Sequence, residues 1–458
     1  MFPWLAFGHI LPFLQLAKLI AQRGHLISFI STPRNIDRLP KLPPALSSLI
    51  TFVKLPLPSS DVQGLPHAAE ATSDLEARHV GYLKRAYDLL QHQLSTFLQS
   101  SNPDFIICDY APFWLPPIAR RLGIPTVFFS IFIASVLAFT SPPADDEDED
   151  YRKTVEDLTE KPRWVPFETT SGYYRPFEAK VSFEMAVVGG GGQEFPELHR
   201  FRQMLRGCDF VAVRTCPELE HDWLKLLEQI HKKPVFPIGV LPNPIKEEDE
   251  EGDEDTWKSI KEWLDDGKEK GSVVYVAFGS EAIPSQEELT EIATGLELSG
   301  LPFFWVLRSS DDPRRELPEG FEERTAGRGL VWKGWAPQVK ILGHESVGCM
   351  FCHSGWSSVV EALQFGRPLV LLTFYADQGL NSKLLQEKGL GYLVPRNDDD
   401  GRFRRESVAE SLRTVMLAEE GQSGHREKAA EMQTLFADTE KHESYVHDFL
   451  SSLVQALD

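Results

Sequence analysis

Residues 335–378 read WAPQVKILGHESVGCMFCHSGWSSVVEALQFGRPLVLLTFYADQ and decide the fold more than any other stretch of the sequence. Within them, the apolar run 347–351 predicts a buried strand, Gly355 predicts a turn and residues 356–364 predict a helix. A helix that begins directly after such a turn presents unpaired backbone N–H groups and the positive end of its dipole. The sequence therefore predicts a phosphate site at this junction.

The side chains around the junction could hold each part of a nucleotide sugar. An aromatic ring can stack on a base, histidine and serine can donate hydrogen bonds to phosphate, and carboxylate or amide groups can bind sugar hydroxyls. These side chains are Trp335, His353, Ser357, Ser358, Glu361, Asp377 and Gln378. Their types and order predict a nucleotide-sugar site.

The same stretch resembles the signature box of plant UDP-dependent glycosyltransferases, whose pattern is W-x-P-Q … H … G … T-H-C-G-W-N-S … E … G-x-P … D-Q. Cys352 stands in place of the usual Thr, Ser354 in place of Cys, and Ser357 in place of Asn. Ser357 keeps a hydrogen-bonding group but has a shorter reach than Asn. The resemblance implies an α/β protein of the GT-B class, with two facing Rossmann-like domains and an interdomain cleft.

For the donor site, the resemblance implies a role for each position of the box. The implied contacts are Trp335 on uracil, Gln338 and Glu361 on ribose, His353, Ser357 and Ser358 on phosphate, and Asp377 and Gln378 on the sugar, with Ala336 and Trp356 in the same site. Ser280, after Gly279 at the end of a predicted strand, is a further phosphate candidate. Two alternatives stay open, because Ser358 and Glu361 also match a capping box and Trp335 could be a core aromatic.

The donor that the resemblance implies is UDP-glucose, because Gln378 closes the box as it commonly does in the family's glucose users. Relatives with the same ending also use UDP-rhamnose, so that sugar is the alternative. No Asp-x-Asp pair lies at a strand end in this half of the sequence. We therefore expect no metal and no cofactor beyond the UDP-sugar itself, which is a co-substrate.

Two residues of the N-terminal half indicate acid–base chemistry. His9 lies at the turn between the first strand and the first helix, and Asp109 follows the apolar run 105–108. Ligands of open α/β sheets bind at such carboxyl ends of strands, and a carboxylate there can orient an imidazole and stabilise its charged form. His9 could instead be a structural helix-start residue, and Asp109 an N-cap. In the resembled family these two places carry the catalytic dyad of an inverting transferase.

The expected acceptor is a sugar hydroxyl of a small plant metabolite, such as a terpenoid or flavonoid glycoside. This expectation follows from a resemblance to plant enzymes that lengthen or branch sugar chains, in PWLAFGH (3–9), STPRN (31–35), FGSE (278–281) and ADQG (376–379). The implied acceptor contacts are Trp4, Phe7, Phe113 and Glu281, with variable loops such as 61–74 and 145–194 around them. The alternatives are that the two N-terminal aromatics pack in the core, that Glu281 faces solvent, and that an aglycone is glucosylated directly.

Composition limits the class of protein. The chain has 458 residues, of which 42% are hydrophobic and 25% charged, as in ordinary globular proteins. Its formal net charge of −21 argues against nucleic acid or an anionic membrane as a partner. The most membrane-like stretch, 126–139, is too short to span a bilayer, and the N-terminus has no charged-then-apolar leader pattern. We expect a cytoplasmic monomer.

Five cysteines are an odd and sparse count for a secreted disulfide scaffold. Cys349, Cys352 and His353 formally match the C-x-x-C-H haem-attachment pattern. The same residues already serve as a buried strand and the entrance to the predicted phosphate site, so we set the haem interpretation aside.

Strand and helix patterns alternate along both halves, which predicts parallel sheets covered on both faces. Strands are expected at 26–30, 105–108, 126–129, 210–213, 273–278, 303–307, 347–351 and 369–372, and helices at 10–23, 81–98, 117–122, 218–230 and 285–298. The domains are expected at 1–240 for the acceptor and 257–458 for the donor, joined by an acidic linker at 241–256. The last helix is expected to pack back on the N-terminal domain. The first strand is expected to be short, because the resembled family has several residues before the segment that matches residues 2–4.

Two other classes of protein can be compared with this interpretation. A nicotinamide-dependent oxidoreductase would show G-x-G-x-x-G after a strand, but the two strand ends read FGS at 278–280 and FGH at 7–9. A non-catalytic nucleotide-sugar-binding protein would be expected to lack the His9 and Asp109 pair. The sequence therefore favours an enzyme.

Overall fold

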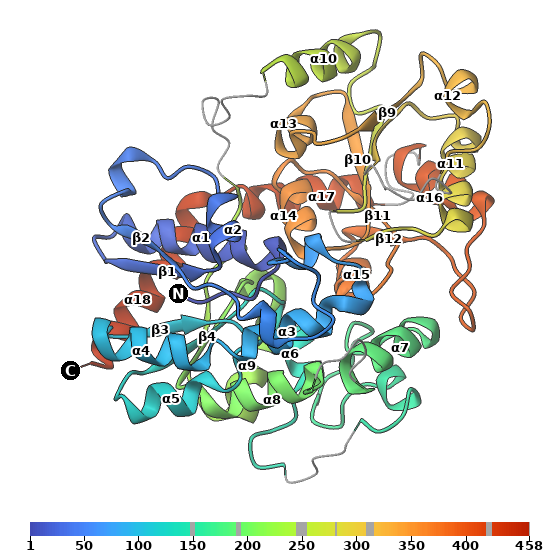
Figure 1. Cartoon of the computed structure of the whole chain (residues 1–458). Helices are drawn as coiled ribbons and strands as arrows, with labels where there is room; N and C mark the ends of the chain where they lie inside the picture. The colour runs from blue at the N-terminus through green and yellow to red at the C-terminus, as the bar shows by residue number, and fades with distance from the viewer. Residues whose placement is uncertain are drawn as a thin grey trace. The chain divides into compact units, whose positions relative to one another are not determined.

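Strands and helices alternate along the chain, and the strand pairs of the described residues are all parallel (Figure 1). The structure is a computed structural model that describes residues 1–146, 152–188, 194–243, 254–279, 282–307, 316–417 and 424–457. It divides into unit 1 (Met1–Glu168, Lys180–Leu241, Glu440–Asp458) and unit 2 (Thr169–Ala179, Pro242–Thr439). Unit 2 thus contains a short segment that the predicted boundaries assign to the N-terminal domain.

The strands of unit 1 form a pair and a four-stranded sheet. The pair is β1 (Ile27–Ser31) with β2 (Ile50–Lys54), and the sheet has the order β3 (Ile106–Cys108), β4 (Thr126–Ser130), β5 (Phe210–Val213) and β6 (Val235–Pro237). The helices of this unit are α1 (Phe7–Ala21), α2 (Pro33–Asp37), α3 (Val80–Asp88), α4 (Gln91–Ser101), α5 (Leu115–Arg121), α6 (Ala134–Thr140), α8 (Glu197–Gly207), α9 (Pro217–His231) and α18 (Thr439–Gln455). Helix α7 (Pro176–Phe183) begins in unit 2 and ends in unit 1.

The first two residues join the pair to the sheet. The N–H of Ile30 donates to Met1 O at 2.9 Å, the N–H of Phe2 donates to Ile107 O at 2.9 Å, and the N–H of Asp109 donates to Phe2 O at 3.2 Å. The expected short first strand is reduced to a single parallel bridge between Phe2 and Cys108. The spatial order is therefore β2, β1, this bridge, β3, β4, β5 and β6.

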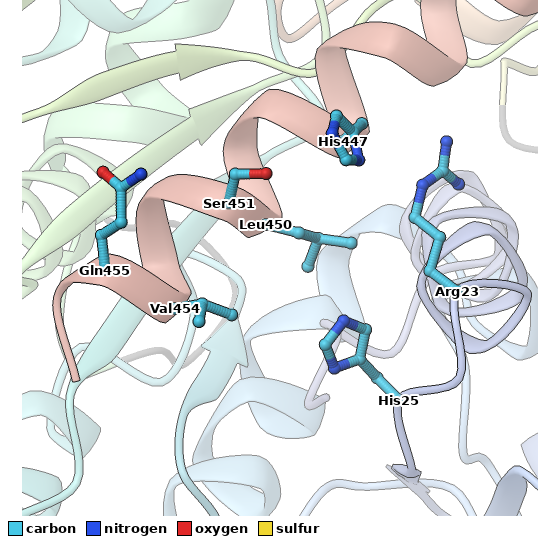
Figure 2. A pocket seen from close by; sticks show the side chains of 7 residues that line it. All are labelled: Arg23, His25, His447, Leu450, Ser451, Val454 and Gln455. Atoms are coloured by element: carbon cyan, nitrogen blue, oxygen red, sulfur yellow. The ribbon is translucent and has the colours of Figure 1, made fainter. Parts of the chain in front are cut away.

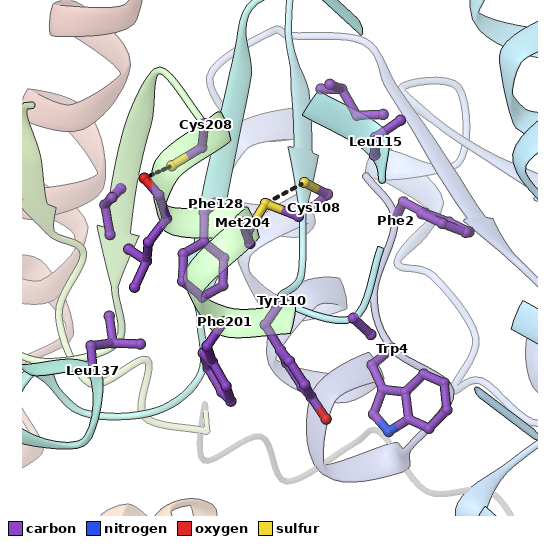
Figure 3. Packing of buried hydrophobic residues seen from close by; sticks show 14 of the residues in the cluster. Phe2, Trp4, Cys108, Tyr110, Leu115, Phe128, Leu137, Phe201, Met204 and Cys208 are labelled. Carbon is purple, nitrogen blue, oxygen red and sulfur yellow. Dashed lines mark hydrogen bonds between the residues drawn. The ribbon is translucent and has the colours of Figure 1, made fainter. Parts of the chain in front are cut away.

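Both faces of the unit 1 sheet are buried, and the side chains alternate between them as a strand's period of two requires. In β4, Phe128 belongs to one apolar cluster, whereas Val127 and Phe129 belong to another on the opposite face. Helices α4, α5, α8 and α9 contribute to the first cluster, and α1 and α18 to the second. Figure 3 shows the first cluster, where the Cys108 thiol lies 3.9 Å from the sulfur of Met204.

Unit 2 has one six-stranded sheet with helices around it. Its strands are β7 (Val273–Ala277), β8 (Phe303–Leu307), β9 (Gly329–Lys333), β10 (Val347–Cys352), β11 (Leu369–Leu371) and β12 (Gly391–Leu393), in the order β12-β11-β10-β7-β8-β9. Its helices are α10 (Glu254–Asp265), α11 (Gln286–Ser299), α12 (Phe321–Arg324), α13 (Gln338–Gly343), α14 (Trp356–Gln364), α15 (Gln378–Glu387), α16 (Arg405–Leu417) and α17 (His425–Phe436).

The strand order of each unit reverses at the centre of its sheet. In unit 2 the reversal falls between β7 and β10, and in unit 1 between the Phe2 bridge and β3. At such a point the two chains leave for opposite faces of the sheet, which opens a crevice at the carboxyl ends of the strands. Each unit therefore has one place where its fold favours a ligand.

The structure differs from the expected elements in one divided helix, in additional helices such as α8, α10, α16 and α17, and in the strands at the sheet edges. The helix expected at 81–98 is two helices, α3 and α4, and at the break the Asp88 carboxylate binds the buried Arg200 guanidinium at 2.8 and 2.6 Å. Four strands were not expected from the sequence: β2, β6, β9 and β12. Each of them lies at the edge of its sheet.

Among the described residues, no helix is both long enough and apolar enough to cross a membrane.

Candidate active site

In unit 1, His9 and Asp109 meet at the point where the strand order reverses. His9 lies in the first turn of α1, and Asp109 directly follows β3. The Nδ1 atom of His9 is 2.7 Å from Oδ2 of Asp109. Because an ionised carboxylate only accepts hydrogen bonds, Nδ1 carries the proton and Nε2 is left as the basic nitrogen. In the described part of the chain, Nε2 has no hydrogen-bond partner.

The Asp109 carboxylate is fully buried and held by the backbone. Its Oδ2 accepts the N–H of Trp4 at 3.0 Å, and its Oδ1 accepts the N–H of Tyr110 at 2.8 Å. A buried carboxylate is costly unless its oxygens are paired in this way. The next helix, α5, begins only at Leu115, so Asp109 does not act as the N-cap that the alternative interpretation describes.

The four predicted acceptor residues lie in different surroundings. Trp4 is only 3% exposed, and its ring meets that of Tyr87 edge-on at 5.3 Å. Trp4 therefore packs in the core, which was the alternative to an acceptor contact. Phe7 and Phe113 are half-buried, with Arg38 5.9 Å from the ring centre of Phe7. Phe113 packs against Phe195, with 4.9 Å between ring centres. Glu281 lies outside the described residues.

Aromatic rings also surround His9 itself. Phe132 meets the imidazole edge-on at 5.4 Å, and the ring of Tyr110 lies 5.9 Å away. Sequence reasoning did not single out either residue. Tyr110 follows Asp109 directly, so its position could have been inferred, whereas Phe132 reaches His9 only through the folded sheet.

In unit 2, the predicted phosphate junction lies between the carboxyl ends of β7 and β10. Helix α14 begins after Gly355, an N-cap residue that has no side chain to cap the first turn. The ring of His353 lies between two glycines: a Cβ on Gly279 would be 2.7 Å from its Cε1, and one on Gly355 would be 2.4 Å from its Nε2. A side chain at either position would displace the imidazole. This close approach explains why both positions are glycine. Ser280 lies outside the described residues.

His353 is held neutral by its surroundings. Burial lowers the pKa of its imidazole to about 4, because the charged form loses its hydration there. Its Nδ1 is buried without a hydrogen-bond partner among the described residues. A buried polar atom without a partner is uncommon, and a phosphate oxygen at the start of α14 would supply one.

A hydrogen-bond network joins Gln338 and Glu361, the two residues predicted to bind ribose. The Nε2 of Gln338 donates to Glu361 Oε2 at 2.5 Å, and its Oε1 accepts the Tyr275 hydroxyl at 3.1 Å. Asn243 donates to the other oxygen of Glu361 at 2.6 Å. Because Glu361 is used in this network and Ser358 is the third residue of α14, the capping-box alternative does not apply.

The remaining residues of the box differ in exposure. Trp335 is 57% exposed, so it is a surface aromatic and not part of the core. Trp356 is buried, and Ala336, Ser357 and Ser358 are half-buried. Sequence reasoning missed Tyr275 and Asn243, because a tyrosine inside an apolar strand and an asparagine in a loop carry no signal of their own.

Asp377 and Gln378 lie where α15 begins. Asp377 is the N-cap position and accepts a hydrogen bond from Asn381 Nδ2 at 2.7 Å. Gln378 is only 4% exposed, and its Oε1 accepts the N–H groups of Phe374 and Tyr375 at 2.8 and 3.2 Å. Gln378 thus shapes the loop that carries both residues.

The cysteines of the haem-like pattern are interior strand residues. Cys349 and Cys352 are fully buried in β10, and burial raises the pKa of each thiol to about 12. In the described ranges, no group of three or more His, Cys, Asp or Glu side chains could hold a metal ion.

Comparison with known proteins identifies the family. The family model "UDP-glucoronosyl and UDP-glucosyl transferase" matches residues 214–419. UDP-glycosyltransferase 91A1 of Arabidopsis thaliana is 51% identical over 459 residues, which cover 99% of this chain and 96% of that protein. The chain belongs to the plant UDP-glycosyltransferases. It is therefore an enzyme that transfers a glycosyl group.

A further relative and a solved structure agree with this assignment. Anthocyanidin-3-O-glucoside rhamnosyltransferase of Petunia hybrida is 38% identical, with 93% of this chain and 88% of that protein covered. The crystal structure of Glycyrrhiza uralensis UGT73P12 with glycyrrhetinic acid 3-O-monoglucuronide matches with a TM-score of 0.77 at 22% identity, over 99% of this chain and 95% of the other. The glycosyltransferase has the GT-B fold, as expected.

A separate surface pocket of the glycosyltransferase does not belong to this site. Figure 2 shows it between the end of α1 and the helix α18, with a volume of about 560 Å³, lined by Arg23, His25, His447, Leu450, Ser451, Val454 and Gln455. His9 lies at the other end of α1, a helix of 15 residues, which is about 22 Å long.

The neutral state of His353 should make the stability of the glycosyltransferase depend on pH. Its folded pKa of about 4 lies below the value of 6.5 for an unfolded chain, so the unfolded state takes up the proton first as pH falls. Stability is therefore lost between about pH 6.5 and pH 4, by about 2 kcal/mol at pH 5. Urea unfolding of wild type and His353→Asn at pH 7 and pH 5 should show the smaller loss in the variant. Equal losses of unfolding free energy in the two proteins would show that His353 is not the group responsible.

Proposed function

We propose that this glycosyltransferase moves glucose from UDP-glucose, with inversion at the anomeric carbon, to a sugar hydroxyl of a small plant metabolite such as a terpenoid or flavonoid glycoside. The observation that carries the proposal is the His9–Asp109 pair, whose basic Nε2 is not used by another group of the described chain. A sugar-binding protein without catalysis would have no need of a buried carboxylate behind an imidazole.

In the proposed reaction, Nε2 of His9 takes the proton of the acceptor hydroxyl. The acceptor oxygen forms a bond to the anomeric carbon, while the bond from that carbon to the diphosphate oxygen breaks and UDP leaves with the electron pair. Asp109 does not take the proton. Its carboxylate stabilises the imidazolium, as in hydrolase triads, and the N–H groups of Trp4 and Tyr110 keep it in position.

In the proposal, the negative charge of the leaving diphosphate is stabilised by unit 2. The first turn of α14 follows a glycine N-cap and offers backbone N–H groups, and the neutral imidazole of His353 offers one N–H. Trp335 has the exposure that stacking on uracil requires, and the paired Gln338 and Glu361 side chains offer amide and carboxylate groups to the ribose hydroxyls. We propose that no metal takes part.

The proposed donor sugar is contacted by the residues at the start of α15. The Asp377 carboxylate is half-buried and can accept hydrogen bonds from sugar hydroxyls. UDP-glucose is proposed from the sequence ending Asp377-Gln378. The Petunia hybrida relative is named as a rhamnosyltransferase, which is the observation that favours UDP-rhamnose as the second candidate.

The proposed acceptor is a glycoside. The same relative is named for an anthocyanidin 3-O-glucoside, which supports an acceptor that already carries a sugar. Phe7 and Phe113 are the predicted acceptor aromatics that remain half-buried, and we propose them, not Trp4, as the rings in contact with the acceptor.

The His9→Ala variant tests the proposed base. We expect turnover to fall by ~10²–10⁴-fold, as is typical when acid–base catalysis is lost. UDP affinity should stay within about twofold of wild type by calorimetry, because His9 belongs to unit 1 and the proposed UDP contacts to unit 2. Asp109→Asn should also impair turnover, since the imidazolium loses its counter-charge. Wild-type turnover in His9→Ala would show that His9 is not the general base.

Donor choice can be measured directly. We expect the wild-type kcat/KM for UDP-glucose to exceed that for UDP-rhamnose with the same acceptor. The Gln378→His variant should lose glucose turnover by about 10-fold or more, while its affinity for UDP changes little. A wild-type preference for UDP-rhamnose would overturn the glucose proposal and leave the transferase assignment intact.

Acceptor choice is tested by comparing a glycoside with its own aglycone at equal concentration. We expect transfer to the glycoside, with NMR showing the new linkage on a sugar hydroxyl. The Phe7→Ala variant should raise the KM for the acceptor more than that for the donor, because the ring is proposed to contact the acceptor alone. Efficient transfer to the aglycone alone would reject the glycoside proposal.

A further inference from the structure

The loop 373–378 carries the two residues proposed to contact the donor sugar. It connects β11 to α15, and Ala376 within it has a φ of 56°, a left-handed conformation that is unfavourable for a residue with a side chain. Such a conformation is strained and persists only where the surroundings enforce it. The contacts of this loop therefore show what fixes the position of Asp377.

A segment from the middle of the sequence, 169–179, makes those contacts within unit 2. The Thr373 hydroxyl donates to Glu178 Oε1 at 2.6 Å and accepts from the Arg175 guanidinium at 2.9 Å. Arg175 also donates to Glu178 at 2.7 Å. Thr373 is fully buried, Glu178 is 4% exposed and the Arg175 side chain is 17% exposed, so these three polar groups are largely shielded from water and hold one another in place.

The same segment also contacts the strained position of the loop. The Tyr174 hydroxyl donates to Ala376 O at 2.9 Å. Gly379, at the start of α15, gives this tyrosine room, because a Cβ there would lie 2.8 Å from Cδ1 of Tyr174 and 2.8 Å from Cδ of Glu178. The loop is thus held at its first residue and again at the residue before Asp377.

A third contact fixes the backbone where the loop begins. The Arg396 guanidinium donates to Thr373 O and packs over the ring of Phe177, with 4.6 Å from its central carbon to the ring centre. Arg175 lies 4.7 Å from the centre of the same ring. Phe177 therefore links the segment to Arg396, and Thr373 is held through both its side chain and its carbonyl.

We propose that segment 169–179 is a positioning element for the donor sugar, in which Glu178 and Tyr174 set the place of Asp377 and Gln378 and thereby the choice among UDP-sugars. This inference rests on the proposed donor site. Neither residue touches the sugar. They act through Thr373 and Ala376, so they are positioning residues and not catalytic ones.

The physical reason for an effect on sugar choice is geometric. UDP-sugars share the uridine and the diphosphate and differ only in the hexose, so discrimination depends on hydrogen bonds to a few hydroxyls. A misplacement of about 1 Å can cost about 100-fold in rate. The proposed uridine contacts, Trp335, Gln338 and Glu361, lie outside the loop 373–378. A shift of this loop should therefore leave the affinity for UDP unchanged.

The test uses a pair of variants at Thr373 in the full chain. Thr373→Val has nearly the same shape but no hydroxyl, so it cannot donate to Glu178. Thr373→Ser keeps the hydroxyl. We expect Thr373→Val to change the ratio of kcat/KM between UDP-glucose and UDP-rhamnose by about 10-fold, with the inhibition constant for UDP within about twofold of wild type. Thr373→Ser should keep a ratio within about threefold of wild type.

Tyr174→Phe gives a second and independent readout, because it removes only the hydroxyl that donates to Ala376 and keeps the ring beside Gly379. We expect the donor ratio to shift by about 3-fold or more. The matched control is Glu387→Gln at the far end of α15, where Thr170 of the same segment donates to Glu387 at 2.9 Å. That anchor is distant from Asp377 along the helix, so the control should keep the wild-type ratio.

The outcomes separate this inference from the proposed function. If the wild-type enzyme transfers sugar and Thr373→Val and Tyr174→Phe keep the wild-type donor ratio, the positioning role is wrong and the proposed function stands. If these variants lose activity equally with each donor and melt at lower temperature, the segment is only structural and the inference is also wrong. Wild-type protein that binds no UDP and transfers no sugar would instead refute the proposed function.

Discussion

The reversal of strand order in the middle of each parallel sheet is the constraint on which both candidate sites depend. Two neighbouring strands there send their chains to opposite faces, so the carboxyl ends of the strands are left uncovered. In unit 2 this places Gly279, after β7, against His353, after β10. In unit 1 it places Asp109, after β3, beside the chain that leads from Phe2 into α1 and His9. Neither arrangement needs a special loop, because the sheet order itself supplies the crevice.

Two buried carboxylates show how the same physical chemistry serves different purposes. Asp109 and Glu178 are both closed to water, and a buried charge costs several kcal/mol unless hydrogen bonds compensate it. Backbone N–H groups compensate Asp109, whereas Arg175 and Thr373 compensate Glu178. Burial by itself would raise the pKa of Glu178, but the hydrogen bonds outweigh it and hold that pKa below its usual value. Asp109 orients an imidazole, and Glu178 holds a loop, yet both are fixed by the groups that compensate them.

The segment 169–179 holds the loop at the proposed sugar site of unit 2, although it lies far from that loop in the sequence. Residues 169–179 precede the part of the chain that carries the signature box, yet they pack on the loop that carries Asp377. The hydrogen bond between Thr373 and Glu178 joins positions 195 residues apart. In the proposed donor site, Trp335, Gln338 and Glu361 would bind the uridine that all UDP-sugars have in common, and segment 169–179 would position the loop at the sugar.

The sequence alone determined the fold class and the buried strands, because fully buried strands are continuous apolar runs. The fixed spacing of the signature box also predicted residues for the candidate donor site. The edge strands β2, β6, β9 and β12 escaped sequence reasoning, since an edge strand has one strand neighbour and stays partly exposed, as the half-buried β6 and β9 show. Only the tertiary structure decided that Trp4 packs in the core, that Gln378 shapes its own loop, and that residues 169–179 belong to unit 2. Each of these depends on contacts that local periodicity does not encode, most of them between residues far apart in the sequence.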